Sequence, residues 1–162
     1  MRFLAFVLVA VVAVASVPAH AARAVIVIRH AEKESQQGDD PDLSIAGEDR
    51  AIALTRFLRH DKIDAIFVTE FKRTQKTAEI LAQQRGITPV IVKAGETKAL
   101  VDRIKALPKD AVVVVVGHSN TVPEILSALG VKDKVAIHEQ EFGRVFVVTP
   151  TDVGASLLEF GY

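Results

Sequence analysis

The sequence has 162 residues, contains no cysteine, and carries 20 basic and 20 acidic side chains, so its formal net charge at pH 7 is zero. This length is typical of one domain with a substantial buried core. The absence of cysteine excludes thiol chemistry and cysteine-based zinc sites. The balanced charge indicates neither nucleic acid nor an anionic membrane, so we expect a small-molecule partner. The sequence does not indicate an oligomeric state.

Residues 1–21 have the pattern of a secretory signal peptide. Arg2 precedes an unbroken apolar run over residues 3–17, and small, spaced residues end the segment at Ala21. The pattern predicts cleavage after Ala21, which leaves residues 22–162 as one exported domain, periplasmic or secreted and without membrane contact. A retained membrane anchor is the alternative. The apolar run is shorter than the ~20 residues that a spanning helix requires.

Short apolar runs recur along the rest of the chain. The run over residues 24–28 is continuously apolar, which is typical of a strand buried on both faces of a sheet. Similar runs follow at intervals. We therefore expect four such strands, over residues 24–28, 64–68, 89–93 and 111–116.

Amphipathic stretches follow these strands, and several begin or end with capping residues. The expected helices run from Ser44 to about His60, from Thr69 to Arg85, over residues 97–107, and from Thr121 to Gly130. Ser44 and Thr69 are the expected N-caps of the first two helices, and Gly86 is a C-terminal stop. Thr121 and Glu124 have the spacing of a capping box.

The C-terminal part of the chain predicts a hairpin. Residues 144–148 and 155–160 are two further strand-like runs, joined through the turn residues 149–152. The alternation of strands and helices before the hairpin favours a mainly parallel sheet with helices on both faces. Ligands of such sheets bind beyond the carboxyl ends of the strands. Residues that directly follow a strand are therefore the candidates for the site.

Two of the expected strands deliver a histidine at that edge of the sheet. Arg29 and His30 follow the first strand, and His118 follows the fourth. Arg73 falls within the first turn of the helix after the second strand, where the helix dipole disfavours a cation. An anion bound between that helix end and Arg73 would remove the conflict.

Each of these residues has an ordinary structural interpretation when it is taken alone. Taken together, two forked guanidiniums suited to phosphate oxygens, one imidazole nucleophile and one imidazole donor form a phosphoryl-transfer site. The predicted catalytic residues are Arg29, His30, Arg73 and His118. No role is assigned to the remaining histidines, His20, His60 and His138.

Residues 117–121, which read GHSNT, also come close to the G-x-S-x-G turn that presents a nucleophilic serine. Thr121 stands where the tight packing of that turn requires glycine. Ser119 also lacks convincing partners for a triad, because only one histidine and two aspartates follow it in the chain. A serine esterase is therefore the weaker hypothesis.

Three blocks make the chain resemble the histidine phosphatase superfamily, in its phosphoglycerate mutase-like group and exported "RHAEK" branch: VIRHAEK, LSIAGEDRA with VTEFKRTQKTA, and VVVGHSNT. The resemblance implies a three-layer α/β/α sandwich with a mainly parallel central sheet over residues 22–162. It implies that His30 is phosphorylated without a metal or cofactor. It also implies that the phosphoryl oxygens are bound by Arg29, Arg73 and His118. The first block has alanine where the family usually has glycine.

The expected function is that of a metal-independent phosphomonoesterase that hydrolyses a small or envelope-associated phosphoester. The alternatives are a non-catalytic phosphate-binding module, a phosphoglycerate mutase-type phosphotransferase, and a serine or metal hydrolase. The proton donor is open: Glu96 is favoured, and the other options are Glu32, Glu34 or no carboxylate. The physiological substrate is not indicated, because selectivity depends on the loops over residues 34–42 and 132–143.

Overall fold

The computed structural model describes residues 22–35 and 38–162. The signal peptide expected over residues 1–21 lies outside the described residues. Within the described part of the chain, no helix is both long and apolar enough to span a membrane.

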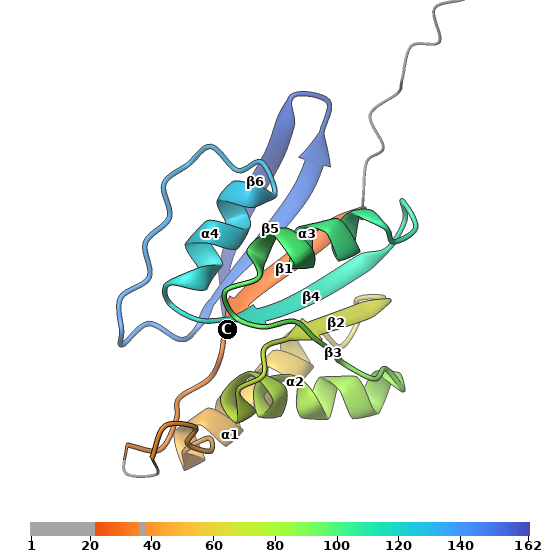
Figure 1. Ribbon diagram of the computed structural model, residues 1–162. Coiled ribbons are helices and arrows are strands. Elements are labelled where there is room, and N and C mark those ends of the chain that lie inside the picture. The colour runs from red at the N-terminus through yellow and green to blue at the C-terminus, as the bar shows by residue number, and fades with distance from the viewer. Residues whose placement is uncertain (1–21, 36–37) are drawn as a thin grey trace, which may run out of the picture.

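The described residues contain one sheet of six strands in the order β3-β2-β4-β1-β5-β6 (Figure 1). The strands are β1 (Ala24–Arg29), β2 (Ala65–Val68), β3 (Val90–Ile91), β4 (Val112–Gly117), β5 (Arg144–Thr151) and β6 (Gly154–Gly161). The first four strands pair in parallel, whereas β5 runs antiparallel to β1 and pairs with β6 as a hairpin. The predicted mainly parallel sheet and closing hairpin are both confirmed.

Two helices cover each face of the sheet, which produces three layers (Figure 1). The helices are α1 (Ile45–Phe57), α2 (Lys72–Arg85), α3 (Thr97–Lys105) and α4 (Thr121–Ala128). Alternate residues of β1 enter different cores: Ile26 and Ile28 pack on the α1 and α2 side, and Val25 and Val27 on the α3 and α4 side. A strand covered on both faces needs apolar residues throughout, which explains the continuous runs in the sequence.

The helix caps agree only partly with the sequence pattern. Ser44 caps α1 by accepting a hydrogen bond from the backbone N–H of Gly47, as predicted. Gly86 ends α2 in the left-handed conformation at φ 64°, also as predicted. The predicted cap at Thr69 is wrong, because α2 begins only at Lys72 and has no side-chain cap.

The capping box predicted at the start of α4 does not form either. This helix begins at Thr121, after Asn120, and has no side-chain cap. The hydroxyl of Thr121 instead accepts a hydrogen bond from the backbone N–H of His118, at 2.9 Å. Thr69 likewise directs its hydroxyl to His118. Both threonines therefore satisfy buried polar groups of one histidine.

Candidate active site

The register of β1 and β4 brings the two predicted histidines together. Arg29 is the pairing partner of Gly117, and the backbone N–H of His30 donates to the carbonyl of Gly117 at 2.9 Å. The imidazoles of His30 and His118 then meet edge to face, with ring centroids 5.2 Å apart. The sheet thus places the two rings side by side at the carboxyl ends of neighbouring parallel strands.

The surroundings of His30 fix which of its ring nitrogens is free. Its Nδ1 lies 2.7 Å from the backbone carbonyl of Ala31, and because a carbonyl only accepts, Nδ1 carries the proton. Nε2 therefore keeps its lone pair. His30 is 4% exposed, and this burial lowers its pKa to about 3. At neutral pH the residue is an uncharged imidazole with a nucleophilic Nε2.

His118 is held by the loop before α2 as well as by its own strand. Its Nε2 lies 3.0 Å from the hydroxyl of Thr69, which in turn lies 3.0 Å from the hydroxyl of Thr74. The ring also meets the edge of Phe71, with centroids 5.4 Å apart. Burial lowers the pKa of His118 to about 4, so this imidazole is neutral at pH 7. A bound phosphate dianion would raise that pKa again.

Arg29 is clamped by the chain segment that precedes β5. Its Nη1 donates to the backbone carbonyls of His138, Glu139 and Glu141 at 2.9–3.0 Å. Its Nη2 donates to the carboxylate of Glu139 at 3.2 Å. The ring of Phe142 stacks on the guanidinium, 4.1 Å from Cζ. Four hydrogen bonds and one stacked ring therefore fix the orientation of this guanidinium.

Arg73 is bound much more loosely in the first turn of α2. Its guanidinium stacks on Phe71, with Cζ 4.3 Å from the ring centre, and its Nη1 lies 3.9 Å from Asp40. The carboxylate of Asp40 also accepts a hydrogen bond from the backbone N–H of Lys72 at 3.0 Å. An aspartate of the chain itself therefore places a negative charge at this helix end.

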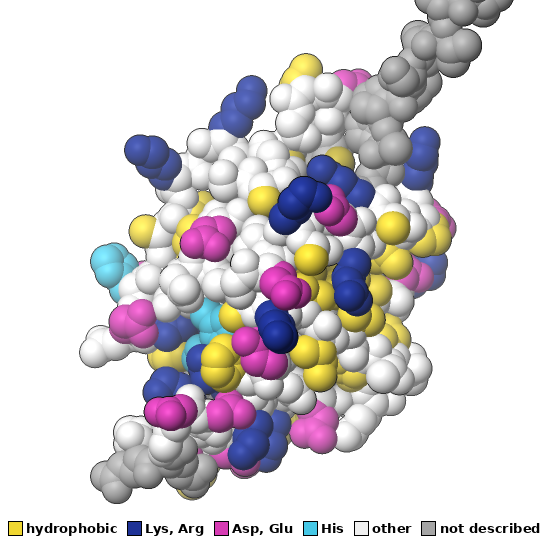
Figure 2. Space-filling view, in the orientation of Figure 1, with side chains coloured by type: hydrophobic (Ala, Val, Ile, Leu, Met, Phe, Trp, Pro, Cys, Tyr) yellow, Lys and Arg dark blue, Asp and Glu magenta, His cyan; other side chains and the backbone are white. Residues whose placement is uncertain are grey.

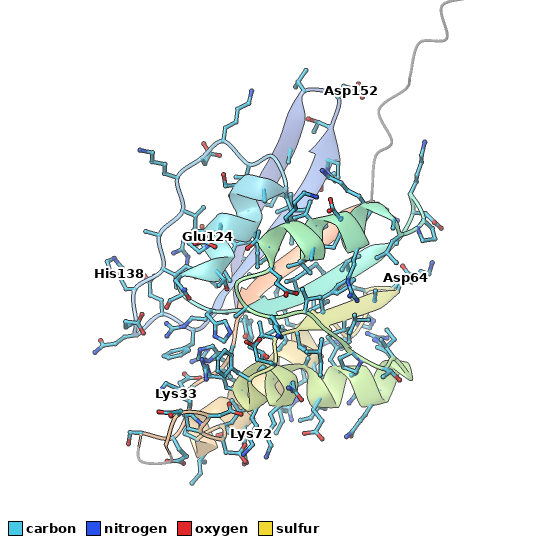
Figure 3. The ribbon with its side chains drawn as sticks, in the orientation of Figure 1. Lys33, Asp64, Lys72, Glu124, His138 and Asp152 are labelled. Atoms are coloured by element: carbon cyan, nitrogen blue, oxygen red, sulfur yellow. The ribbon has the colours of Figure 1, made fainter. Side chains whose placement is uncertain are left out.

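These four predicted residues line one cavity of about 260 Å³, called the histidine cavity below. Figure 2 shows histidine side chains at the surface there, among basic and acidic ones. In Figure 3, Lys33 and Lys72 lie below this end of the sheet and His138 lies above it. The Nε atoms of Arg29 and Arg73 are buried without a hydrogen-bond partner among the described residues. Two unpaired guanidinium donors beside a nucleophilic imidazole suit a phosphoryl group.

None of the carboxylates considered as proton donors lines the histidine cavity. Glu96 directly precedes α3 and borders a different hollow. Glu32 forms a bidentate pair with Arg50, at 2.6–2.9 Å. Glu139 is the one carboxylate among the residues described as lining the cavity. The sequence did not single it out, because an exposed glutamate in an irregular segment carries no distinctive pattern.

Ser119 lines the histidine cavity but is not arranged as a nucleophile. Its hydroxyl donates to the carboxylate of Glu139 at 2.8 Å, and none of the hydrogen bonds found in residues 22–35 and 38–162 joins it to a histidine. A serine nucleophile needs a hydrogen bond to its general base. The side chain of His138 is exposed, although its carbonyl helps to hold Arg29.

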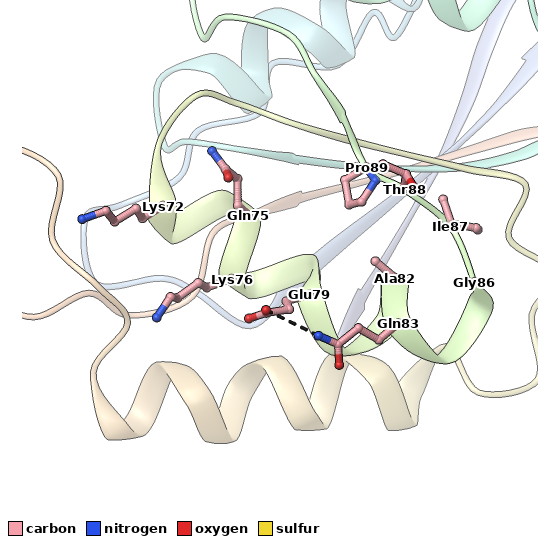
Figure 4. A pocket seen from close by; sticks show the side chains of 10 residues that line it. All are labelled: Lys72, Gln75, Lys76, Glu79, Ala82, Gln83, Gly86, Ile87, Thr88 and Pro89. Carbon is pink, nitrogen blue, oxygen red and sulfur yellow. Dashed lines mark hydrogen bonds between the residues drawn. The ribbon is translucent and has the colours of Figure 1, made fainter.

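Other features of the surface lie away from these residues. A hollow of about 510 Å³ runs along α2 and the turn after it, bordered by Lys72, Lys76, Glu79 and Gln83 (Figure 4). None of the four predicted site residues lines it. In the part of the chain that the structure describes, no group of three or more histidine, aspartate and glutamate side chains could hold a metal ion.

Part of the chain matches a known protein family. The family model of the histidine phosphatase superfamily (branch 1) matches residues 25–95, a stretch that contains Arg29, His30 and Arg73. His118 lies beyond the matched stretch. A search among curated proteins finds no match.

Solved structures show the same fold. The protein histidine phosphatase SixA complexed with tungstate aligns with a TM-score of 0.73 at 16% identity, over 85% of this chain and 96% of that chain. A putative phosphohistidine phosphatase SixA from Agrobacterium tumefaciens aligns with a TM-score of 0.68 at 20% identity, over 86% and 99%. A mycobacterial glucosyl-3-phosphoglycerate phosphatase aligns with a TM-score of 0.69 at 13% identity, over 86% and 98%. At these identities the likeness concerns the fold.

Proposed function

We propose that this chain is a member of the histidine phosphatase superfamily, whose family model matches residues 25–95, and that it is a metal-independent phosphomonoesterase that forms a phosphohistidine at His30. The state of the His30 ring carries the proposal. With Nδ1 bound to the carbonyl of Ala31, the ring presents an unprotonated Nε2 in a cavity that Arg29 and Arg73 also line. This arrangement suits nucleophilic attack on phosphorus.

In the proposed reaction, Nε2 of His30 attacks phosphorus in line and the bond to the alkoxide leaving group breaks. Arg29, Arg73 and a hydrogen-bonding His118 stabilise the charge on the three equatorial oxygens. Water then attacks the phosphohistidine, so that inorganic phosphate leaves and His30 is restored. The leaving group takes its proton from solvent in this scheme, because the cavity offers no carboxylate with a raised pKa. Phosphoesters whose alcohol is a good leaving group are therefore the favoured substrates.

The substrate is proposed only as a class: a small or envelope-associated phosphoester. The proposal of an envelope substrate rests on the signal peptide pattern of residues 1–21, which would export the domain to the periplasm or outside the cell. The names of two structural neighbours give chemically different substrates, phosphohistidine for one and glucosyl-3-phosphoglycerate for the other. A cavity that holds mainly the phosphoryl group is compatible with both.

Covalent labelling tests this function. Rapid acid-free quenching of the enzyme with a labelled phosphomonoester should place an acid-labile, alkali-stable label in the peptide that contains His30. His30→Ala should lose the label and nearly all turnover. His118→Ala should keep slow labelling, with a loss of roughly 2.7–4 kcal/mol in transition-state stabilisation if it resembles the loss of one oxyanion donor. The exposed His60 is the matched control, since His60→Ala leaves the cavity intact.

Several outcomes would overturn the proposal. Label on Ser119 would restore the serine mechanism. Loss of turnover on chelation, with recovery on addition of zinc or manganese, would establish a metal hydrolase. Tight binding of phosphate without turnover of any phosphomonoester would identify a binding module.

A further inference from the structure

Glu139 is the acidic member of an otherwise basic set of charged residues around the histidine cavity. The other charged side chains that line the cavity are Lys33, Arg29 and Arg73. The carboxylate of Glu139 bridges two strand ends: Oε2 accepts from Nη2 of Arg29 at 3.2 Å, and Oε1 accepts from the hydroxyl of Ser119 at 2.8 Å. The hydrogen bond from Ser119 and the charge of Arg29 lower the pKa of Glu139, so the group is ionised at neutral pH.

The contact between Glu139 and Arg29 is not needed to orient the guanidinium. Three backbone carbonyls already hold Nη1, and Phe142 already stacks on the plane of the group. The side chain of Glu139 is 83% exposed in its pair with Arg29, so the carboxylate can move into solvent without unpacking the core. The carboxylate also binds Arg29 through the same kind of oxygen contact that a phosphoryl group makes.

We propose that Glu139 is an internal counter-anion that competes with the phosphoryl group for Arg29 and thereby promotes release of inorganic phosphate. The inference rests on the proposed function, in which phosphate is the product. In the empty site the carboxylate neutralises part of the charge of Arg29. When phosphate occupies the cavity, the two anions face one guanidinium and repel each other. Loss of phosphate lets Glu139 return to Nη2, so each turnover ends with the exchange of one anion for another.

The replacement Glu139→Gln tests the role of charge alone. The amide oxygen of glutamine still accepts hydrogen bonds from Ser119 and Arg29, whereas the negative charge is lost. The variant should bind inorganic phosphate about tenfold more tightly, as expected when one repulsive charge near the protein surface is removed. Calorimetry with inorganic phosphate and its inhibition constant in phosphomonoester turnover should agree. The matched control is Asp133→Asn, which removes an exposed carboxylate from the same segment but outside the cavity.

Two results would overturn this role of Glu139. Unchanged or weaker phosphate binding by Glu139→Gln would mean that the carboxylate orients Arg29 or does nothing to phosphate. If Asp133→Asn tightens phosphate binding equally, the net charge of the segment is responsible and the contact between Glu139 and Arg29 is not. A thermal unfolding midpoint equal to that of the wild type verifies that Glu139→Gln folds.

The proposed function and the role of Glu139 fail in different ways. If the wild type hydrolyses phosphomonoesters and Glu139→Gln binds phosphate with the same affinity as the wild type, only the role of Glu139 is wrong. If neither protein turns over substrate and Glu139→Gln still binds phosphate about tenfold more tightly, only the catalytic proposal is wrong.

Discussion

The two walls of the histidine cavity hold their arginines by different means. On the wall formed by β1 and residues 138–142, Arg29 makes four hydrogen bonds to one chain segment and stacks on Phe142. On the wall formed by the start of α2, Arg73 stacks on Phe71 and has one distant ion pair with Asp40. Each guanidinium nevertheless keeps a buried Nε without a partner among the described residues.

Because of this difference, the two arginines offer a phosphoryl group different things. Arg29 is already oriented when a phosphoryl group arrives, and most of its donors are committed to the protein. Arg73 has more donors to offer, and its position can adjust to the ligand at the cost of some side-chain entropy. The α2 wall is instead made rigid by buried threonines: Thr77 accepts from the backbone N–H of Ala31 at 2.9 Å, and Thr74 bonds to Thr69. One wall thus fixes its cation, and the other fixes the neighbours of the histidines.

The largest expected effect concerns folding stability when each arginine is removed. Arg29→Ala removes the donor that three backbone carbonyls share and should lower the free energy of unfolding by about 2–4 kcal/mol. Arg73→Ala should lower it by less than about 1 kcal/mol, since its ion pair is long and partly exposed. Urea unfolding of both variants measures the difference. Equal losses would show that the two walls do not differ in the way described.

An intermediate effect is expected from Thr77, a fully buried residue of α2. Thr77→Val removes the acceptor of the Ala31 N–H and should cost about 1–3 kcal/mol of stability, because a buried donor is left unpaired. Thr77→Ser keeps the hydroxyl and is the matched control. Since Ala31 also fixes the His30 ring, Thr77→Val should lower kcat more than it raises KM. If Thr77→Val is as stable and as active as the wild type, the α2 wall does not help to position His30.

A smaller effect is expected in the pH dependence of folding stability, through the two buried histidines. Burial lowers the pKa of His30 to about 3 and of His118 to about 4, whereas an unfolded histidine has a pKa near 6.5. Below about pH 6.5 the two histidines bind protons in the unfolded chain but stay neutral in the folded chain. The free energy of unfolding therefore falls as pH falls from 6.5 towards 4. Replacing one histidine by asparagine should remove about 1–2 kcal/mol of the loss between pH 7 and 5.

Chemical unfolding at the two pH values, for the wild type and for each asparagine variant, measures this pH effect. Saturating phosphate should shrink the loss further, because a bound anion favours the protonated imidazoles. Identical pH dependence in all three proteins would mean that the buried imidazoles titrate normally.

The sequence predicts most of the fold, and it places Arg29, His30, Arg73 and His118 near one edge of the sheet, where the structure brings them to one cavity. Fully covered strands need continuous apolar runs, and parallel strands bring their carboxyl ends to one edge, so the sequence alone was enough to place His30 and His118 together.

The support of those residues could not be read from the sequence. Arg29 is held mainly by backbone carbonyls from an irregular segment. Every residue type has a backbone carbonyl, so the sequence does not reveal these contacts. The hydroxyls of Thr69 and Thr121 were assigned to helix ends because local capping rules do not include a competing buried histidine. The place of Glu96 after a strand favours it as the proton donor, yet it borders another hollow.

The position of β1 in the sheet also determines when the cavity can form during synthesis. This strand leaves the ribosome first, but its two neighbours are β4, which starts at Val112, and β5, which starts at Arg144. Both edges of an apolar strand therefore stay unpaired until most of the chain has been made, which invites aggregation and slows folding. A chain that stops before Arg144 would lack the strand that covers one edge of β1 and anchors the segment that holds Arg29. Truncation from the C-terminus should abolish phosphate binding before it removes any of the four residues Arg29, His30, Arg73 and His118.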